Sequence, residues 1–152
     1  MNLPTEKLES SAPAGTIWFG GPVDRSKLSL RVFGESVDLT EITRLLGHPP
    51  TKERKERKKA SWRLAAPEMN GADLESQIEW ILSRLSKDLS AWKKITEKYQ
   101  VDLFCGLFLD APNRGISLSP ETMKEISSRG IKLGFDIYSF EPEGADPVDG
   151  GQ

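Results

Sequence analysis

The chain has 152 residues, of which 37% are hydrophobic and 29% are charged, and this balance is typical of a globular protein rather than a disordered one. A formal net charge of −2 provides no overall attraction to nucleic acid or to an anionic membrane. The single cysteine, Cys105, excludes an intrachain disulfide and a cysteine-rich zinc site.

Both ends of the chain differ in composition from its middle. Residues 1–15 are rich in Pro, Ser, Ala and Glu, and residues 141–152 are acidic and rich in Pro and Gly. Neither has the apolar periodicity that offsets the entropy of ordering, so we expect two disordered tails around one domain at 16–140. No secretory signal and no membrane-spanning run are recognisable, and we expect a cytoplasmic protein without membrane contact.

The first predicted elements are a strand and a capped helix. Apolar and polar residues alternate over 28–33, which predicts a strand. A helix begins after Asp38, whose carboxylate can cap the free amides, and ends at Gly47. A charged loop at 51–59 then leads to a short strand around Trp62.

The longest predicted element is a helix from about Asp73 to Tyr99, which would extend for roughly 40 Å at 1.5 Å per residue. Its apolar residues recur at steps of three and four and form one continuous stripe: Leu74, Ile78, Ile81, Leu85, Leu89, Trp92, Ile95 and Tyr99.

Four further elements complete the chain. Residues 101–109 are apolar on both faces and predict a central strand, and a short strand follows at 116–118. Ser119 and Pro120 open another helix, and a last strand extends over 131–140. The fold class is α+β: a mixed or mostly antiparallel sheet of four to five strands, with one long and two short helices packed on one face, in the order β-α-β-α-β-β-α-β.

Taken in order, these segments resemble a bacterial family. The run LSLRVFGESVDLTEITRLLGHPPT, followed by SWRL, is similar to the N-terminal half of the domain-of-unknown-function 4279 family. The segments QIEWILSRL and ISLSPETMKEISSRGIKLGFDIY are similar to its C-terminal half, so the resemblance covers about residues 28–138. Because the family has no assigned activity, the resemblance implies no catalytic residues.

The most distinctive local feature is the run TKERKERKK at 51–59. It contains two acidic and six basic residues, a local charge of +4, and the basic ones are Lys52, Arg54, Lys55, Arg57, Lys58 and Lys59. Clustered cations can contact the phosphates of a nucleic acid or another phosphorylated ligand. A solvated loop, or one folded against the acidic C-terminal residues, is the structural alternative. No aromatic residues interleave with these charges, so a stacking groove for single strands gains no support, and nucleic acid is the less expected partner.

A candidate pocket involves the last strand. Asp136 and Tyr138 share one face of that strand, opposite Phe135, and an ion pair with a neighbouring Arg or Lys is the structural alternative for Asp136. The strand superficially resembles that of an RNA-recognition motif, but Leu133 and Ile137 replace its basic and second aromatic residues. The candidate pocket comprises Asp136, Tyr138, Trp62 and Arg31.

A candidate interaction surface involves Trp80. Helical geometry points Trp80 away from the apolar stripe, with Arg84 and Lys87 nearby, and exposed tryptophans are frequent at interface hot spots. Coverage by residues 17–19 is the structural alternative. The favoured hypothesis is a non-enzymatic binding or protein-interaction module that uses Trp80, Arg84 and Lys87. The alternative hypothesis is a nucleic-acid or phosphorylated-ligand binder that uses the basic residues of 52–59.

Reactive side chains are few in this sequence. His48 is the sole histidine and Cys105 the sole cysteine, so a His/Cys metal site cannot be assembled in one chain. Cys105 lies in an apolar strand, where a thiol is usually buried and inert. We therefore assign no catalytic residue, metal ligand or cofactor, and leave the oligomeric state open.

Overall fold

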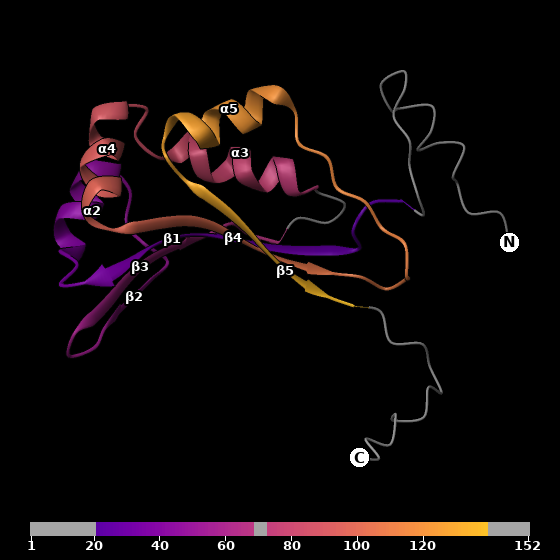
Figure 1. The fold of residues 1–152 in the computed structure, drawn as a ribbon, viewed down its shortest axis with the longest axis horizontal. Coiled ribbons are helices and arrows are strands. Elements are labelled where there is room, and N and C mark those ends of the chain that lie inside the picture. Colours follow the sequence, from indigo (N-terminus) through magenta and orange to yellow (C-terminus); the bar gives the residue numbers. More distant parts are fainter. Residues whose placement is uncertain (1–20, 69–72, 140–152) are drawn as a thin grey trace, which may run out of the picture.

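The computed structural model describes residues 21–68 and 73–139, which form a single sheet covered on one side by helices (Figure 1). Its strands are β1 (Arg25–Glu35), β2 (Lys52–Lys55), β3 (Lys59–Ala65), β4 (Gln100–Phe108) and β5 (Lys132–Tyr138). Its helices are α2 (Leu39–Leu46), α3 (Leu74–Arg84), α4 (Leu89–Lys98) and α5 (Pro120–Ser128). The predicted tails at 1–15 and 141–152 lie outside the described residues.

The five strands are ordered β2-β3-β1-β4-β5, and every neighbouring pair is antiparallel except β4 and β5. The parallel pair arises because α5 connects β4 to β5 over the helical face, the connection that parallel neighbours require. The predicted α+β fold, with a mixed sheet and helices on one face, is confirmed.

The helix predicted to extend from Asp73 to Tyr99 is instead two helices, α3 and α4. Leu85 adopts an extended conformation with φ −99° and ψ 162°, and the Asp88 side chain caps α4 by accepting from the Ser90 amide. Ser86 donates its amide to Leu46 and accepts from the Trp92 indole at 2.7 Å. The apolar stripe persists because both helices bury it, α3 beside α5 and α4 beside α2 (Figure 1).

Two other segments differ from the sequence prediction. The basic run at 51–59, predicted as a loop, forms β2 and the start of β3 in a hairpin closed by backbone bonds between Glu56 and Lys59. Residues 116–118, predicted as a strand, are not paired; the neighbouring Gly115 forms an isolated bridge with Pro22 instead. The hairpin therefore extends the sheet on the β3 side, which places its cations in the sheet itself.

The core lies between the sheet and the helices. Trp62 and Trp92 are its largest fully buried side chains, and the Trp62 indole donates to the Thr43 hydroxyl at 3.0 Å. Cys105 is also fully buried, and desolvation raises the pKa of its thiol to about 12. A thiol with that pKa stays protonated at neutral pH, so Cys105 acts as a small apolar side chain of the core.

A side-chain contact joins α3 to the beginning of α5. The Glu75 carboxylate accepts from the Ser119 amide at 2.7 Å, beside the Ser119 hydroxyl that caps α5. Hydrogen bonds from Ser119 and Thr122 lower the pKa of Glu75. Because the charged form is the one stabilised, this contact between the two helices is strongest while Glu75 is ionised.

Replacing Glu75 by glutamine is expected to lower the free energy of unfolding by about 1 kcal/mol at pH 6. A folded-state pKa below the unfolded value of 4.5 stabilises the fold above that value, and the stabilisation is lost as pH falls through the folded pKa. Urea denaturation at several pH values should therefore show the difference between wild type and Glu75→Gln shrinking towards pH 3. Glu79→Gln, an exposed change on the same helix, is the control. A difference that stays constant down to pH 3 would contradict the assignment.

Candidate functional site

The side of the sheet away from the helices carries the most unusual set of side chains. Residues paired across neighbouring strands point to the same side of the sheet. On this side lie the strand residues that alternate with the buried core residues. We call it the open face, because no helix of the described residues covers it (Figure 1). Its basic side chains are Arg25, Lys27, Arg31, Lys52, Arg54, Lys59, Arg63 and Lys132, and its aromatic side chains are Phe33, Phe104, Phe108 and Tyr138.

Cations and aromatic rings alternate across this face. The Arg25 guanidinium lies 4.2 Å from the Phe108 ring centroid, and the Tyr138 ring stacks on Phe108 at 4.5 Å with an interplanar angle of 2°. The Arg31 guanidinium lies 4.2 Å from the Phe104 ring centroid. Contacts of this kind contribute about 0.5–1 kcal/mol each at exposed sites and hold the long side chains in place. The open face is therefore an ordered cation–aromatic surface.

Arg31 is anchored at the centre of this surface by Asp102. Its Nε and Nη2 atoms donate to the two carboxylate oxygens at 2.8 and 2.6 Å, a bidentate pair. The hydrogen bond with Asp102 raises the pKa of Arg31, although desolvation opposes the change. Asp102 is 8% exposed, so the buried carboxylate is neutralised by the cation above it.

The charge of the open face is strongly positive. It carries eight basic side chains against Glu35, Asp102 and Asp136, a formal charge of +5. No described residue forms an ion pair with five of the cations, which are Arg25, Lys52, Lys59, Arg63 and Lys132. The surface therefore has net charge available for an external anion.

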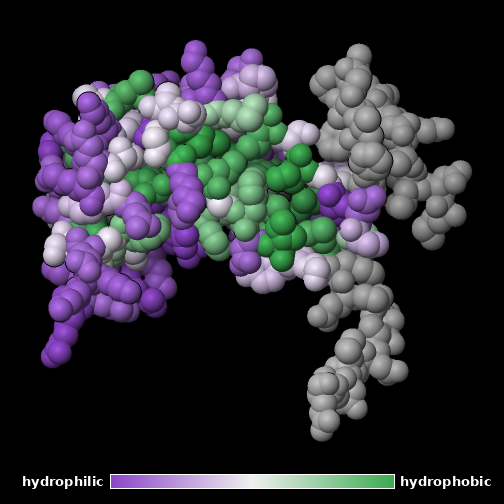
Figure 2. Space-filling view, viewed as in Figure 1, coloured by the Kyte–Doolittle hydropathy of each residue, from purple (hydrophilic) through white to green (hydrophobic). Residues whose placement is uncertain are grey.

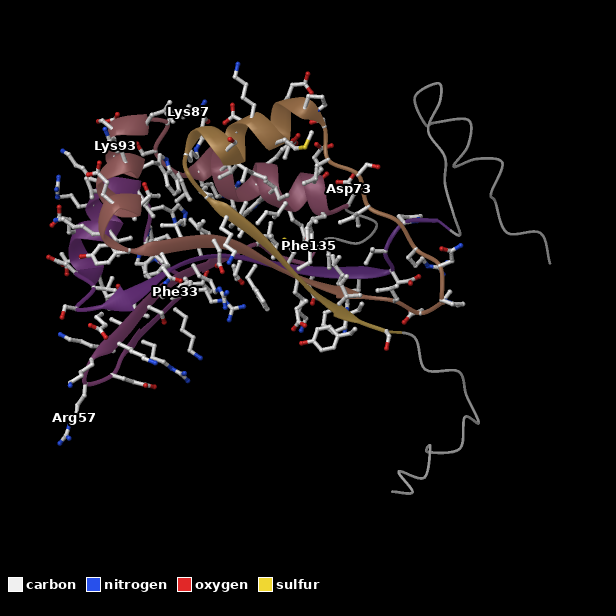
Figure 3. The ribbon with its side chains drawn as sticks, viewed as in Figure 1. Phe33, Arg57, Asp73, Lys87, Lys93 and Phe135 are labelled. Atoms are coloured by element: carbon white, nitrogen blue, oxygen red, sulfur yellow. The ribbon has the colours of Figure 1, made fainter. Side chains whose placement is uncertain are left out.

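The β2–β3 hairpin continues this charge beyond the sheet. Lys52 and Arg54 lie on the open face beside Arg63, and Arg57 projects from the turn (Figure 3). Residues 51–59 are all exposed. Figure 2 shows the hairpin as a hydrophilic projection at the lower left of the molecule. The basic run is thus one end of a basic surface that extends across β3 and β1.

The structure separates the residues of the candidate pocket. Arg31, Asp136 and Tyr138 lie on the open face, but Trp62 lies on the helical side with no exposed surface. Asp136 interacts with its strand neighbour: a hydrogen bond with the Asp136 carboxylate raises the pKa of Tyr138. Trp62 is paired with Val32, and this register turns both side chains into the core. The four residues therefore do not form one pocket.

The candidate interaction surface lies on the helical layer, on the side of the sheet opposite the open face. Trp80 is partly buried against the core, and the Arg84 guanidinium lies 3.8 Å from the centroid of its ring. Arg84 also donates to the Trp80 carbonyl at 3.0 Å. Lys87 is exposed in the connection between α3 and α4. Residues 17–19, the segment weighed as a cover for Trp80, lie outside the described residues.

Sequence reasoning missed the aromatic part of the open face. Phe33, Phe104 and Phe108 alternate along their strands with buried core residues, and this alternation was the available signal. In β4 that signal was weak, because apolar residues point to both sides of this strand. A phenylalanine that alternates with core residues lies on the other face of the sheet, whatever its hydrophobicity.

Several features are absent from the part of the chain that the structure describes. Residues 21–68 and 73–139 contain no group of three or more His, Cys, Asp or Glu side chains placed to hold a metal ion. Within the same ranges, no helix is long and apolar enough to cross a membrane.

Comparison with known proteins identifies the domain. No curated protein and no solved structure matches the chain significantly. Residues 24–140, more than three quarters of the chain, match the family described as a domain of unknown function, DUF4279. The match includes every described strand and helix. The chain therefore belongs to the DUF4279 family.

Proposed function

We propose that the protein is a non-enzymatic binding module that binds single-stranded nucleic acid across the open face of its sheet. The observation that carries the proposal is the alternation of cations with aromatic rings on that face. Cations neutralise backbone phosphates, and aromatic rings stack on unpaired bases, the two interactions on which proteins that bind single strands depend.

The shape of the surface favours an extended ligand. Neighbouring strands lie about 4.8 Å apart, so five strands present a face roughly 20 Å wide, comparable with surfaces that accommodate several nucleotides. The unpaired cations are spread from Lys52 on β2 to Lys132 on β5. A small phosphorylated ligand would contact only one or two of them.

Tyr138 supplies a position for an unpaired base. The residue is 50% exposed on the edge strand β5, and only one face of its ring is stacked on Phe108. A base placed on the other face would extend the stack that Arg25, Phe108 and Tyr138 begin. Such stacking contributes about 1–3 kcal/mol per base and requires an unpaired strand, which distinguishes it from binding to a duplex.

This proposal differs from the sequence-based hypothesis in its surface and partner. The basic run contains no aromatic residues, so sequence reasoning disfavoured nucleic acid. In the fold, aromatic residues from β1, β4 and β5 lie on the same face as the basic residues of the β2–β3 hairpin. The surface around Trp80 is a weaker candidate, since Arg84 covers one face of the indole.

The test is fluorescence anisotropy with a labelled 20-nucleotide oligothymidylate, measured at 50 and 200 mM salt. With about five phosphate contacts, affinity should fall roughly 100-fold over that range. The triple variant Lys52→Gln/Arg54→Gln/Arg63→Gln removes cations of the open face and should reduce the salt slope by about 2. Its affinity at 50 mM salt should fall by at least ~10-fold.

The matched control is Lys94→Gln/Lys98→Gln/Lys124→Gln, which changes the net charge equally on exposed helical positions. It should bind like the wild type. Equal losses in both triple variants would indicate a nonspecific charge effect and contradict the proposal. Poly-glutamate binding more tightly than the oligonucleotide would also contradict it and would identify an acidic protein as the partner. Circular dichroism verifies that each variant is folded.

A further inference from the structure

A second candidate site lies on the helical side of the sheet, away from the open face. The facing sides of α3 and α5, with the start of α4, enclose a groove of about 440 Å³. That volume is within the range of about 300–1,000 Å³ typical of small-molecule sites. Its lining includes Ile78, Leu82 and Leu89, together with Lys87 from the connection between α3 and α4 (Figure 3).

The groove contains a buried cation with unused hydrogen-bonding capacity. Arg129 is 5% exposed, and its Nη1 donates to the carbonyl and the carboxylate of Glu125 at 2.9 and 2.5 Å. The Nε atom is buried and has no acceptor among the described residues, and none is found there for Nη2. An unsatisfied buried donor costs about 1–3 kcal/mol, more when it is charged, so this arrangement requires an explanation.

Arg31 indicates which group the Nε and Nη2 atoms of Arg129 are suited to bind. In Arg31, the same Nε and Nη2 edge grips both carboxylate oxygens of Asp102. The planar fork of a guanidinium matches a carboxylate in this way. In Arg129 the Nε and Nη2 atoms have no carboxylate partner among the described residues, while Glu125, which pairs with Nη1, is 58% exposed on the groove.

We propose that this groove binds a small monocarboxylate with an apolar body, whose carboxylate is held by Arg129. The apolar part of the lining accommodates the hydrocarbon, and Arg129 receives the charge. Glu79 and Glu125 also line the groove and would repel a ligand with a second negative charge. This site is independent of the open face, so it neither supports nor depends on nucleic-acid binding.

The test uses hexanoate as the probe and nuclear magnetic resonance of ¹⁵N-labelled full-length protein. The side-chain Nε–H signal of Arg129 should shift in a saturable manner as hexanoate is added. Hexanol lacks the charge and should not shift this signal, and inorganic phosphate should bind more weakly because of the two glutamates. Absence of a saturable hexanoate shift up to 10 mM, or an equal shift with hexanol, would overturn the proposal.

Two glutamate variants avoid any loss of the buried arginine. Glu125→Gln removes a competing carboxylate from the groove and should tighten hexanoate binding about fivefold. Glu121→Gln lies on the same helix outside the groove lining and should leave the affinity unchanged. Equal affinities in the two variants would contradict the assignment of the carboxylate to Arg129. Tighter binding of phosphate than of hexanoate would replace the monocarboxylate by a phosphorylated ligand and overturn the proposed class.

Discussion

Replacing Trp62 by alanine is expected to lower the free energy of unfolding by about 4 kcal/mol, the largest effect of a single substitution considered for this domain. The indole has no exposed surface, and it lies where β3 meets α2. Its removal leaves a cavity between sheet and helix and deprives the Thr43 hydroxyl of its donor. Domains of this size are stabilised by roughly 5–15 kcal/mol, so the variant should be close to unfolding at 37 °C.

Urea denaturation measures this loss directly, and two variants separate its causes. Trp62→Phe keeps most of the volume but loses the indole donor, so it should cost about 1–2 kcal/mol. Trp80→Ala removes a partly buried indole and should cost less than Trp62→Ala. If Trp80→Ala were the more destabilising of the two alanine variants, the placement of Trp62 in the core would be wrong.

Replacing Asp102 by alanine is expected to cost about 3 kcal/mol. The substitution leaves the Arg31 guanidinium on the sheet without the carboxylate that accepts from its Nε and Nη2 atoms. Breaking a fully buried pair costs about 3–5 kcal/mol. Because the Arg31 side chain is 35% exposed, water solvates part of its charge, and we expect a loss at the lower end of that range.

Comparison with variants of the same face tests the cause of this loss. Asp136→Ala removes a carboxylate from the open face that has no ion pair among the described residues, and it should cost less than 1 kcal/mol. The double variant Arg31→Met/Asp102→Leu removes both charges and should recover most of the lost stability. A double variant as unstable as Asp102→Ala would show that packing, rather than the stranded guanidinium, causes the loss.

The helix boundaries show which features of the fold nearby residues in the sequence can predict. Asp38 and Ser119 were predicted as helix caps, and their side chains accept from Glu41 and Thr122 amides. Cap chemistry is decided by residues three positions apart, so the sequence contains it. The break at 85–88 was missed because the apolar stripe continues through it. Asp88, which caps α4, was a local signal of this break, and the bond from the Ser86 amide to Leu46 of α2 adds a tertiary cause.

The same division applies to the candidate site. The basic run at 51–59 was recognisable in the sequence as a cluster of charge. Its folding into a hairpin, and the residues that lie beside it in the sheet, were not recognisable. Trp62 was grouped with Asp136 and Tyr138, although strand register turns it to the opposite face. Register depends on pairing between segments far apart in the chain, such as β1 with β4, and no local pattern specifies it.

Sequence by itself determined the fold class, the caps and the shortage of reactive side chains, because each depends on composition or on residues a few positions apart. Tertiary structure alone decided which charges meet which rings. Arg31 contacts Phe104 and Asp102 only because β1 lies beside β4, and the guanidinium of Arg129 is buried because α5 packs on α3 and its end lies over Trp92 of α4. Both candidate sites follow from long-range packing, whose free energy is summed over the whole core rather than contained in any one segment.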